Sequence, residues 1–247
     1  MRIKMASRIQ NGWLKSMYRP KDCDYSVTDI CMSSAQLWAK ANTVFTEENT
    51  EKTVGFKSFL GSALHNVIEN QDEDGCIKEL SWVRTLADGT RIGGTCDELR
   101  WRYSVNKWRL GDVKLKGDYP TKKFLGIGTK AVPNPKPEQE KEQLQMSIYR
   151  WLFDGMFDIE DKGVIYLFTP GHSAWAAYPE MQEVWLDLLP ISTMDTYIKG
   201  KLAVTKLPTQ PEKDCPDWLC NYCNFTEACN HYKKPEEECT KGFSNEK

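Results

Sequence analysis

The N-terminal part of the chain carries apolar residues at helical spacing. Ser26 or Thr28 can cap a helix that runs through Leu37 to about Ala41. Over residues 54–70 apolar side chains again recur every three or four positions, which predicts a second helix. Two helices are therefore expected before the first strand.

Three short runs of strand character follow, at residues 77–84, 91–101 and 107–114. Asp88-Gly89 between the first two is a strong hairpin signal, and residues 104–106 separate the last two. These runs predict a three-stranded antiparallel meander.

The second half of the chain has a weaker pattern. Residues 116–137 are rich in Lys, Gly and Pro and lack periodicity, which predicts a loop. The pattern then predicts a helix over 137–157, a buried strand over 163–168, a candidate strand over 174–178 and a helix over 179–202. This order indicates an α/β or α+β fold with a mixed central sheet flanked by helices. We place the core at residues 1–204 and a cysteine-rich segment packed on it at 205–247.

Composition narrows the class of protein. The 247 residues include 33 Lys+Arg and 35 Asp+Glu, for a net charge of −2, with 40% hydrophobic residues. This balance is typical of a globular protein and argues against a broad basic face, although a local basic groove stays open. No apolar run approaches the ~18–20 residues of a membrane span, and the basic N-terminus is not followed by an apolar block. We expect a cytoplasmic protein with no membrane partner.

Nine cysteines are distributed unevenly along the chain. Their odd number and the lack of an export signal argue against a disulfide framework. Four lie close together, at Cys215, Cys220, Cys223 and Cys229. A Cys-x-x-Cys pair can bind one metal or cluster from a tight turn, and a third thiol can return to the same centre. The spacing predicts a metal knot at the C-terminus, with either zinc or iron–sulfur.

Acidic residues and a lysine gather on two neighbouring strands of the meander. Alternation puts Leu110, Asp112 and Lys114 on one face of the third strand. Asp97 lies about eight residues before the centre of the turn and Asp112 about seven after it, which makes them cross-strand neighbours. Two carboxylates that close repel each other unless a cation lies between them. Oxygen ligands of this kind suit Mg²⁺ or Mn²⁺.

Further polar residues occur at one-turn spacing on the predicted helices. Gly61, His65 and Glu69 share one helix face, and Gln145 and Tyr149 share another. Each signal alone is weak, because a helix histidine or an Asp-x-Lys on a strand is commonly just a solvated residue. Their order along the chain is more specific than any one of them.

That order resembles the RecB-like branch of the PD-(D/E)XK nucleases. The matching motifs are Gly61-x-x-x-His65, Gly94-x-x-Asp97, Asp112-Val113-Lys114 and Gln145-x-x-x-Tyr149. A subset of the branch, which includes the CRISPR-adaptation exonucleases and the AddB nuclease, carries an iron–sulfur cluster closed by a trio like Cys220, Cys223 and Cys229. The resemblance covers residues 26–232 and implies a restriction-endonuclease-like core.

The resemblance also implies roles for individual residues. It assigns a divalent metal, Mg²⁺ or Mn²⁺, to His65, Asp97, Asp112 and the backbone carbonyl of Val113. Lys114 would orient or activate the attacking water, and Gln145 and Tyr149 would complete the catalytic set beside it. This is sound chemistry for phosphodiester hydrolysis, which needs a strong nucleophile and relief of charge on the phosphate. Glu69 or Glu98 would assist a second metal.

The sequence leaves the fourth ligand of the cluster open. In the cluster-bearing relatives one cysteine lies far upstream, which favours Cys31 here. Cys215 would instead make the knot local. The resemblance implies a 4Fe-4S cluster, whereas a local four-cysteine knot would equally suit Zn²⁺.

The resemblance implies DNA as the substrate, single-stranded or with free ends. Lys116, Lys122, Lys123 and Lys130 in the predicted loop are candidates to grip phosphates, although they equally fit a solvated loop. We expect a metal-dependent DNA exonuclease in a phage or prokaryotic recombination, replication or repair setting. The chain has no Gly-x-x-x-x-Gly-Lys-Ser/Thr motif, so a helicase or recombination partner would expose the ends. The alternatives are a non-catalytic DNA-binding subunit and a zinc-knuckle binding module, and RNA stays open as a substrate.

Overall fold

The computed structural model groups the chain into two compact units. Its described residues are 23–43, 61, 63, 73–128, 132–133, 135–171, 178–220, 223, 225–226 and 228–231. The first unit comprises residues 1–31 and 53–200, and the second comprises residues 32–52 and 201–247. The second unit therefore joins the cysteine-rich segment with an N-terminal helix that the sequence-based division had placed in the core.

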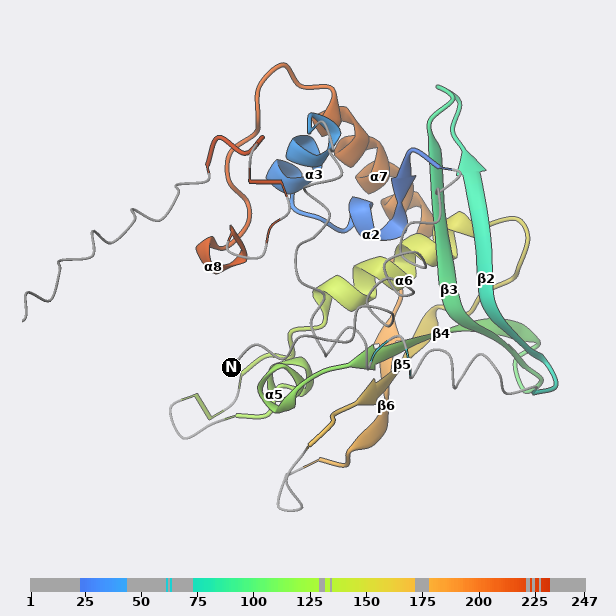
Figure 1. Cartoon of the computed structure of the whole chain (residues 1–247). Coiled ribbons are helices and arrows are strands. Elements are labelled where there is room, and N and C mark those ends of the chain that lie inside the picture. Colours follow the sequence, from blue (N-terminus) through green and yellow to red (C-terminus); the bar gives the residue numbers. More distant parts are fainter. Residues whose placement is uncertain are drawn as a thin grey trace, which may run out of the picture. The chain divides into compact units, whose positions relative to one another are not determined.

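A mixed sheet forms the centre of the first unit (Figure 1). Its strands are β1 Tyr25–Ser26, β2 Cys76–Thr85, β3 Arg91–Arg102, β4 Lys107–Leu115, β5 Lys162–Phe168 and β6 Met181–Asp187. They are ordered β1-β3-β4-β5-β6, with β2 also pairing with β3. The β1–β3 and β4–β5 pairs are parallel, and the β2–β3, β3–β4 and β5–β6 pairs are antiparallel.

Helices of the first unit flank this sheet. The described helices are α2 Val27–Ile30, α3 Ser34–Ala41, α5 Asp118–Leu125, α6 Glu140–Leu152, α7 Ile191–Thr205 and α8 Asp217–Cys220. Helix α6 contacts β2, β3 and β4, and α2 contacts α6, β1 and β3. The first unit is thus an α/β fold with a mixed six-stranded sheet, consistent with a restriction-endonuclease-like core. The predicted fold class is confirmed.

The core of the first unit lies between α6 and the sheet. Ile148 and Trp151 of α6 are at most 1% exposed, as are Leu99, Leu110 and Ile165 of the strands. Each such side chain stabilises the fold by roughly 1.5–3 kcal/mol relative to an exposed position. This close packing fixes the position of α6 on the sheet. It therefore also fixes where the polar residues of α6 lie relative to the strands.

The predicted helix from Ser26 to Ala41 is in fact two helices. Ser26 caps α2, and Ser33 caps α3, each in a capping box. The Ser33 hydroxyl accepts a hydrogen bond from the Gln36 amide at 3.2 Å, which starts a new helix instead of continuing the first. The Ser-x-x-Gln spacing is the local signal for this restart.

The prediction of an unstructured loop over 116–137 was wrong for its first part, where α5 forms. The helix starts after Gly117 and ends at Gly126, which has a φ of 67° that suits glycine. Pro120 lies in the first turn, where its missing amide breaks no intrahelical hydrogen bond. A proline that looks like a helix breaker is therefore compatible with this short helix.

The predicted helix over 179–202 was also wrong in its first half, which is strand β6. Pro190 precedes Ile191, the first residue of α7. A proline is favoured at a helix start and strongly disfavoured inside a helix, so one continuous helix through this position would be costly. Of the candidate strand at 174–178, residues 174–177 lie outside the described residues, and Tyr178 is not in a strand.

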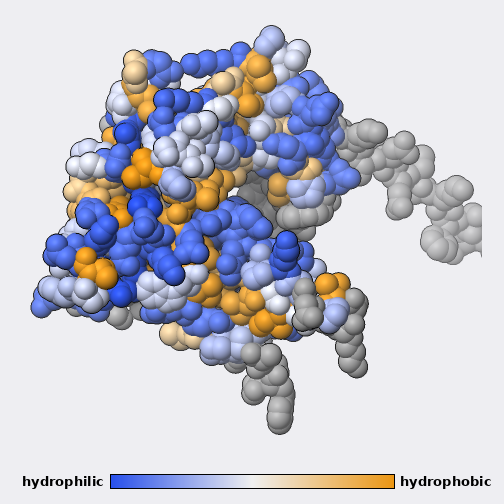
Figure 2. Space-filling view, turned by 180° about the vertical axis from the view of Figure 1, so that it is seen from behind, coloured by the Kyte–Doolittle hydropathy of each residue, from blue (hydrophilic) through white to orange (hydrophobic). Residues whose placement is uncertain are grey.

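None of the described helices has the length and apolar character that crossing a membrane requires. On the face shown in Figure 2, hydrophilic residues cover much of the described surface, with hydrophobic residues interspersed among them.

Candidate active site and cysteine pocket

Two acidic residues of neighbouring strands come together at the middle of the sheet. The β3–β4 register pairs Glu98 with Gly111, which carries Asp97 next to Asp112. The Val113 amide donates a hydrogen bond to Asp97 Oδ2 at 2.7 Å. The main chain of Val113 therefore lies directly beside the Asp97 carboxylate. Counting residues from the turn predicts this cross-strand arrangement correctly.

Lys114 lies against the same carboxylates. Its Nζ is 2.7 Å from Asp112 Oδ2, and the Asp112 side chain is only 5% exposed. Burial acts to lower the pKa of Lys114, but the charges of Asp112, Asp97 and Glu142 outweigh it and raise that pKa above its usual value. Lys114 is therefore an ammonium ion at neutral pH, held beside two carboxylates.

Helix α6 completes this cluster. Tyr149 is 6% exposed, and its side chain hydrogen bonds with that of Gln145. Burial raises the pKa of Tyr149, and the charges of Asp112 and Asp97 raise it further, so the phenol keeps its proton. The two residues of the predicted Gln-x-x-x-Tyr motif thus lie together at the site.

Gly94 allows α2 and α6 to approach β3 closely. A Cβ atom at this position would lie 2.6 Å from Val27 Cγ2 and 2.9 Å from Tyr149 Cε1. Only a residue without a side chain fits there. The glycine of the Gly-x-x-Asp motif therefore positions Tyr149 against the strand that carries Asp97.

Glu142 belongs to the same cluster, although sequence reasoning missed it. This carboxylate on α6 is 6% exposed and pairs with Lys116 Nζ at 2.6 Å. Together Glu142, Gln145 and Tyr149 form a stripe at three- and four-residue spacing on one helix face. That polar stripe beside an apolar one is the signal that would have found it.

The candidate DNA-binding lysines are engaged in ion pairs. Lys116 pairs with Glu142, Lys122 with Asp118 at 2.7 Å and Lys123 with Glu138 at 3.1 Å. Lys130 lies outside the described residues. The Lys122 and Lys123 pairs are exposed, and exposed ion pairs contribute little to stability. Lys122 and Lys123 can therefore exchange a carboxylate partner for a phosphate at little cost.

The remaining predicted metal ligands are not gathered at Asp97. His65 and Glu69 lie outside the described residues. Glu98 faces the opposite side of the sheet from Asp97, where its Oε1 accepts a hydrogen bond from Tyr166 at 2.6 Å. Glu98 is therefore not positioned to assist a second metal beside Asp97.

On that opposite side, Glu98 forms a small cluster with Glu73 and Cys76. Within the described parts of the chain, it is the one group of three potential ligand atoms that lie within 4.8 Å of one another. Arg100, however, pairs with Glu73 at 2.5 Å and with Glu98 at 2.9 Å. Arg109 Nη2 also lies 3.9 Å from Glu98 Oε1. Because two guanidinium groups already pair with the two carboxylates, this cluster is a structural ion-pair network.

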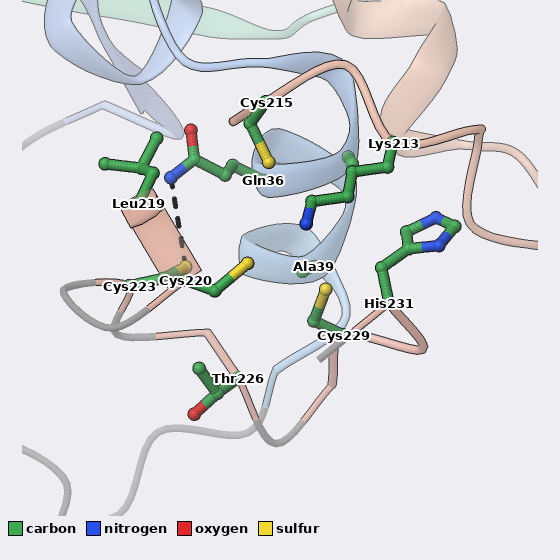
Figure 3. Close-up of a pocket in the computed structure, with 11 residues that line it drawn as sticks. Gln36, Ala39, Lys213, Cys215, Leu219, Cys220, Cys223, Thr226, Cys229 and His231 are labelled. Atoms are coloured by element: carbon green, nitrogen blue, oxygen red, sulfur yellow. Dashed lines mark hydrogen bonds between the residues drawn. The ribbon is translucent and has the colours of Figure 1, made fainter. Parts of the chain in front are cut away.

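A pocket in the second unit gathers four thiols, those of Cys215, Cys220, Cys223 and Cys229 (Figure 3). Helix α3 supplies the other wall through Ala35, Gln36 and Ala39. The Cys223 amide donates to the Cys220 carbonyl at 3.2 Å, and the Cys229 amide donates to the Thr226 carbonyl at 3.3 Å. The Cys-x-x-Cys pair thus lies on a tight turn, and Cys229 returns to the same pocket.

Polar side chains surround the thiols of the pocket. Lys213 directs its amine among the sulfurs (Figure 3), and a hydrogen bond with Asp217 raises the pKa of Lys213. Gln210 Nε2 donates to Cys229 Sγ at 3.2 Å. Positive charge and donors near a thiol favour its anionic form, which is the form that binds metal. Burial acts in the opposite direction at Cys215, where it raises the thiol pKa.

The sulfurs are spread more widely than one zinc ion would hold them. Tetrahedral zinc with Zn–S bonds of about 2.3 Å brings its sulfurs to about 3.8 Å from one another. Since the Glu73 cluster is the single tight group among the described residues, no three of the four thiols lie within 4.8 Å of each other.

Side chains that sequence reasoning missed tie the cysteine segment to α3. The Asp214 carboxylate accepts hydrogen bonds from the amides of Ser34 at 2.6 Å and Ala35 at 3.1 Å. The Trp38 indole donates to the Leu207 carbonyl at 2.9 Å. An acidic group stabilises the N-terminus of a helix, but its partner here lies 180 residues away in the chain, so no local pattern reveals it.

The two candidates for the fourth cysteine ligand belong to different units of the structure. Cys215 lines the pocket with the other three thiols. Cys31 is the C-terminal cap of α2 and belongs to the first unit. It precedes α3 by three residues along the chain. Both residues remain candidates.

No protein-family model matches the chain, and no curated protein matches it in sequence. Among solved structures, the crystal structure of SSO0001 matches with a TM-score of 0.58 and 17% sequence identity, over 90% of this chain and 96% of that chain. At that identity the likeness concerns the fold alone.

Proposed function

We propose that the chain is a metal-dependent deoxyribonuclease, an exonuclease acting on single-stranded or end-containing DNA. The observation that carries the proposal is the convergence of Asp97, Asp112 and Lys114 from β3 and β4 beside Tyr149 of α6. This is the arrangement expected of a PD-(D/E)XK nuclease of the RecB-like branch.

The donor set suits a hard divalent cation. Asp97 and Asp112 are adjacent carboxylates in a largely buried site, and each prefers a cation nearby. They would hold Mg²⁺ or Mn²⁺, with the Val113 carbonyl and His65 as further ligands. The bound metal would supply a water of lowered pKa and an electrophile for the phosphate oxygens.

The chain's own residues supply the rest of the chemistry. Lys114 keeps its proton, so its ammonium would orient the attacking water and stabilise the negative charge that develops on the phosphate. Tyr149 also keeps its proton, so it would act as a hydrogen-bond donor to a phosphate oxygen. Glu142 holds Lys116 beside this site, where Lys116 would contact the next phosphate.

We also propose a 4Fe-4S cluster bound by Cys220, Cys223 and Cys229, with Cys31 or Cys215 as the fourth ligand. The Cys-x-x-Cys turn and the return of Cys229 to the same pocket support a metal centre here, with Zn²⁺ as the alternative to the cluster. The second candidate function is a non-catalytic DNA-binding subunit that keeps the cluster, and only an activity measurement separates it from the nuclease.

The test is cleavage of end-labelled single-stranded and duplex DNA by anaerobically purified protein with Mg²⁺ or Mn²⁺. Asp112→Ala should abolish cleavage, and Lys114→Ala should slow it by about 10²–10³-fold, with DNA binding largely retained. Asp158→Ala is the matched control, because this aspartate has a 70% exposed side chain that pairs with Lys107 at the surface. A folded, DNA-binding protein that cleaves nothing would favour the non-catalytic subunit.

A further inference from the structure

An apolar groove adjoins the candidate active site. It is formed by the start of α2, the middle of β2, the first half of β3 and Tyr149 of α6. Its volume is about 600 Å³. Trp82, Val83, Val27 and Gly94 are among the residues that line it. All these residues belong to the first unit.

The groove and the carboxylates share Tyr149 as a neighbour. Tyr149 and Gly94 line the groove, and Tyr149 also lies within the electrostatic influence of Asp97 and Asp112. Gly94 precedes Asp97 by three residues on β3, a distance of about 10 Å at strand rise. When a phosphate of the DNA lies at the carboxylates, the base of that nucleotide or of the next one along the DNA strand can therefore reach the groove.

The lining suits an uncharged aromatic ligand. None of the described residues that line the groove carries a formal charge. The hydroxyls of Ser81 and Thr95 are hydrogen bonded to each other at 2.6 Å. An anionic phosphate would lose its hydration there without gaining a counter-charge, whereas a base would bury its apolar faces at no such cost.

Trp82 is the feature that points to a stacked base. Its side chain is 46% exposed, and its partner across the β2–β3 ladder is Gly94. Because a glycine stands opposite, no cross-strand side chain covers the indole from that position of β3. A large exposed indole beside a groove is a typical platform for nucleobase stacking, which tolerates any sequence because every base has an aromatic face.

We propose that this groove is a nucleobase subsite, in which the base of an unpaired nucleotide next to the scissile phosphate stacks on Trp82. The inference rests on the proposed nuclease function. It gives a physical reason for preferring single strands, because a base held in a duplex must leave its stack before it can enter the groove. It also predicts that this preference is independent of base identity.

The subsite can be tested by binding alone, in full-length protein that carries Asp112→Asn and contains no divalent metal. Fluorescence anisotropy would give the affinity for a single-stranded oligonucleotide of mixed sequence and for a blunt duplex. Trp82→Ala should weaken single-strand binding by about 5- to 150-fold, the usual value of one base–aromatic stack, and Trp82→Phe should retain much of the affinity. Duplex binding should be unchanged in both variants.

Trp185→Ala is the matched control. This tryptophan is 43% exposed, but it lies on β6 and stacks with Arg102 and Arg109 instead of lining the groove. It should leave single-strand affinity unchanged. In an oligonucleotide series with one abasic site moved along the strand, one position of that site should abolish the difference in affinity between Trp82→Ala and its parent, because the stacked base is then missing.

The outcomes separate the two proposals. Equal single-strand affinity of Trp82→Ala and its parent, or an equal loss for duplex, would overturn the subsite even if metal-dependent cleavage is observed. A selective loss with no cleavage under any metal would keep the subsite and overturn the nuclease. A protein that binds no DNA would overturn both.

Discussion

Gly94 gives the sharpest test of how the site is built. A Cβ at this position would lie 2.6 Å from Val27 Cγ2 and 2.9 Å from Tyr149 Cε1, closer than real Cβ contacts. Gly94→Ala must therefore push α2 or the Tyr149 ring away from β3. Overpacking of this kind costs about 1–3 kcal/mol. Because Tyr149 lies beside Asp97 and Asp112, we expect DNA cleavage to fall together with stability.

Gly200→Ala is a control variant that we expect to raise the free energy of unfolding instead of lowering it. Gly200 lies inside α7, and a Cβ there would meet nothing within 4 Å. Replacing a helical glycine by alanine stabilises a helix by up to about 1 kcal/mol. The measurement is urea unfolding followed by circular dichroism, which gives the change in free energy of unfolding for each variant. If Gly94→Ala were as stable as the wild type, or were stabilised as Gly200→Ala is expected to be, the close approach at Gly94 would be refuted.

Three further predictions concern the site charges and the cysteine pocket. Because the folded-state pKa of Lys114 is raised, its ion pair with Asp112 should stabilise the fold from neutral pH up to about pH 10.4, and this stabilisation should be lost as the pH rises through the raised value. Lys114→Met should therefore melt at a lower temperature than the wild type at pH 8 and converge with it at strongly alkaline pH. Burial acts to raise the pKa of Asp214, but hydrogen bonds from the Ser34 and Ala35 amides outweigh it and lower that pKa overall. The Asp214 carboxylate should therefore stabilise the fold by about 1 kcal/mol above about pH 3.9, and this stabilisation should be lost as the pH falls further. In an acid titration over that range, Asp214→Asn should lose less stability than the wild type. Cys220→Ser should contain less iron per chain than the wild type and melt at a lower temperature. Of Cys31→Ser and Cys215→Ser, the variant with the same two losses identifies the fourth ligand. A normal iron content in Cys220→Ser would contradict the cluster.

Local patterns predict that the polar residues on β3, β4 and α6 lie near one another. Strand alternation and counting from one turn place Asp97, Asp112 and Lys114 together, because an antiparallel hairpin fixes its own register. One-turn spacing on a helix does the same for Gln145 and Tyr149. These predictions need only the geometry of a single element or of two adjacent strands.

The wrong predictions have physical causes that local hydrophobic periodicity does not report. Residues 118–125 form a helix although they include Pro120, because proline is tolerated in a first turn. Residues 181–187 form a strand because β5 offers an antiparallel partner over its whole length, a contact that no short window contains. Asp214 stabilises a helix start that lies 180 residues earlier in the sequence. The strand and the distant cap depend on tertiary neighbours.

The central claim is that Asp97 and Asp112 hold the divalent ion that cleavage requires. The most direct measurement is the rate of single-stranded DNA cleavage as a function of Mn²⁺ concentration, for the wild type, Asp97→Asn and Asp112→Asn. We predict saturable activation of the wild type, with both variants inactive or activated only at much higher Mn²⁺. Cleavage by either variant with the wild-type rate and Mn²⁺ dependence would contradict the claim.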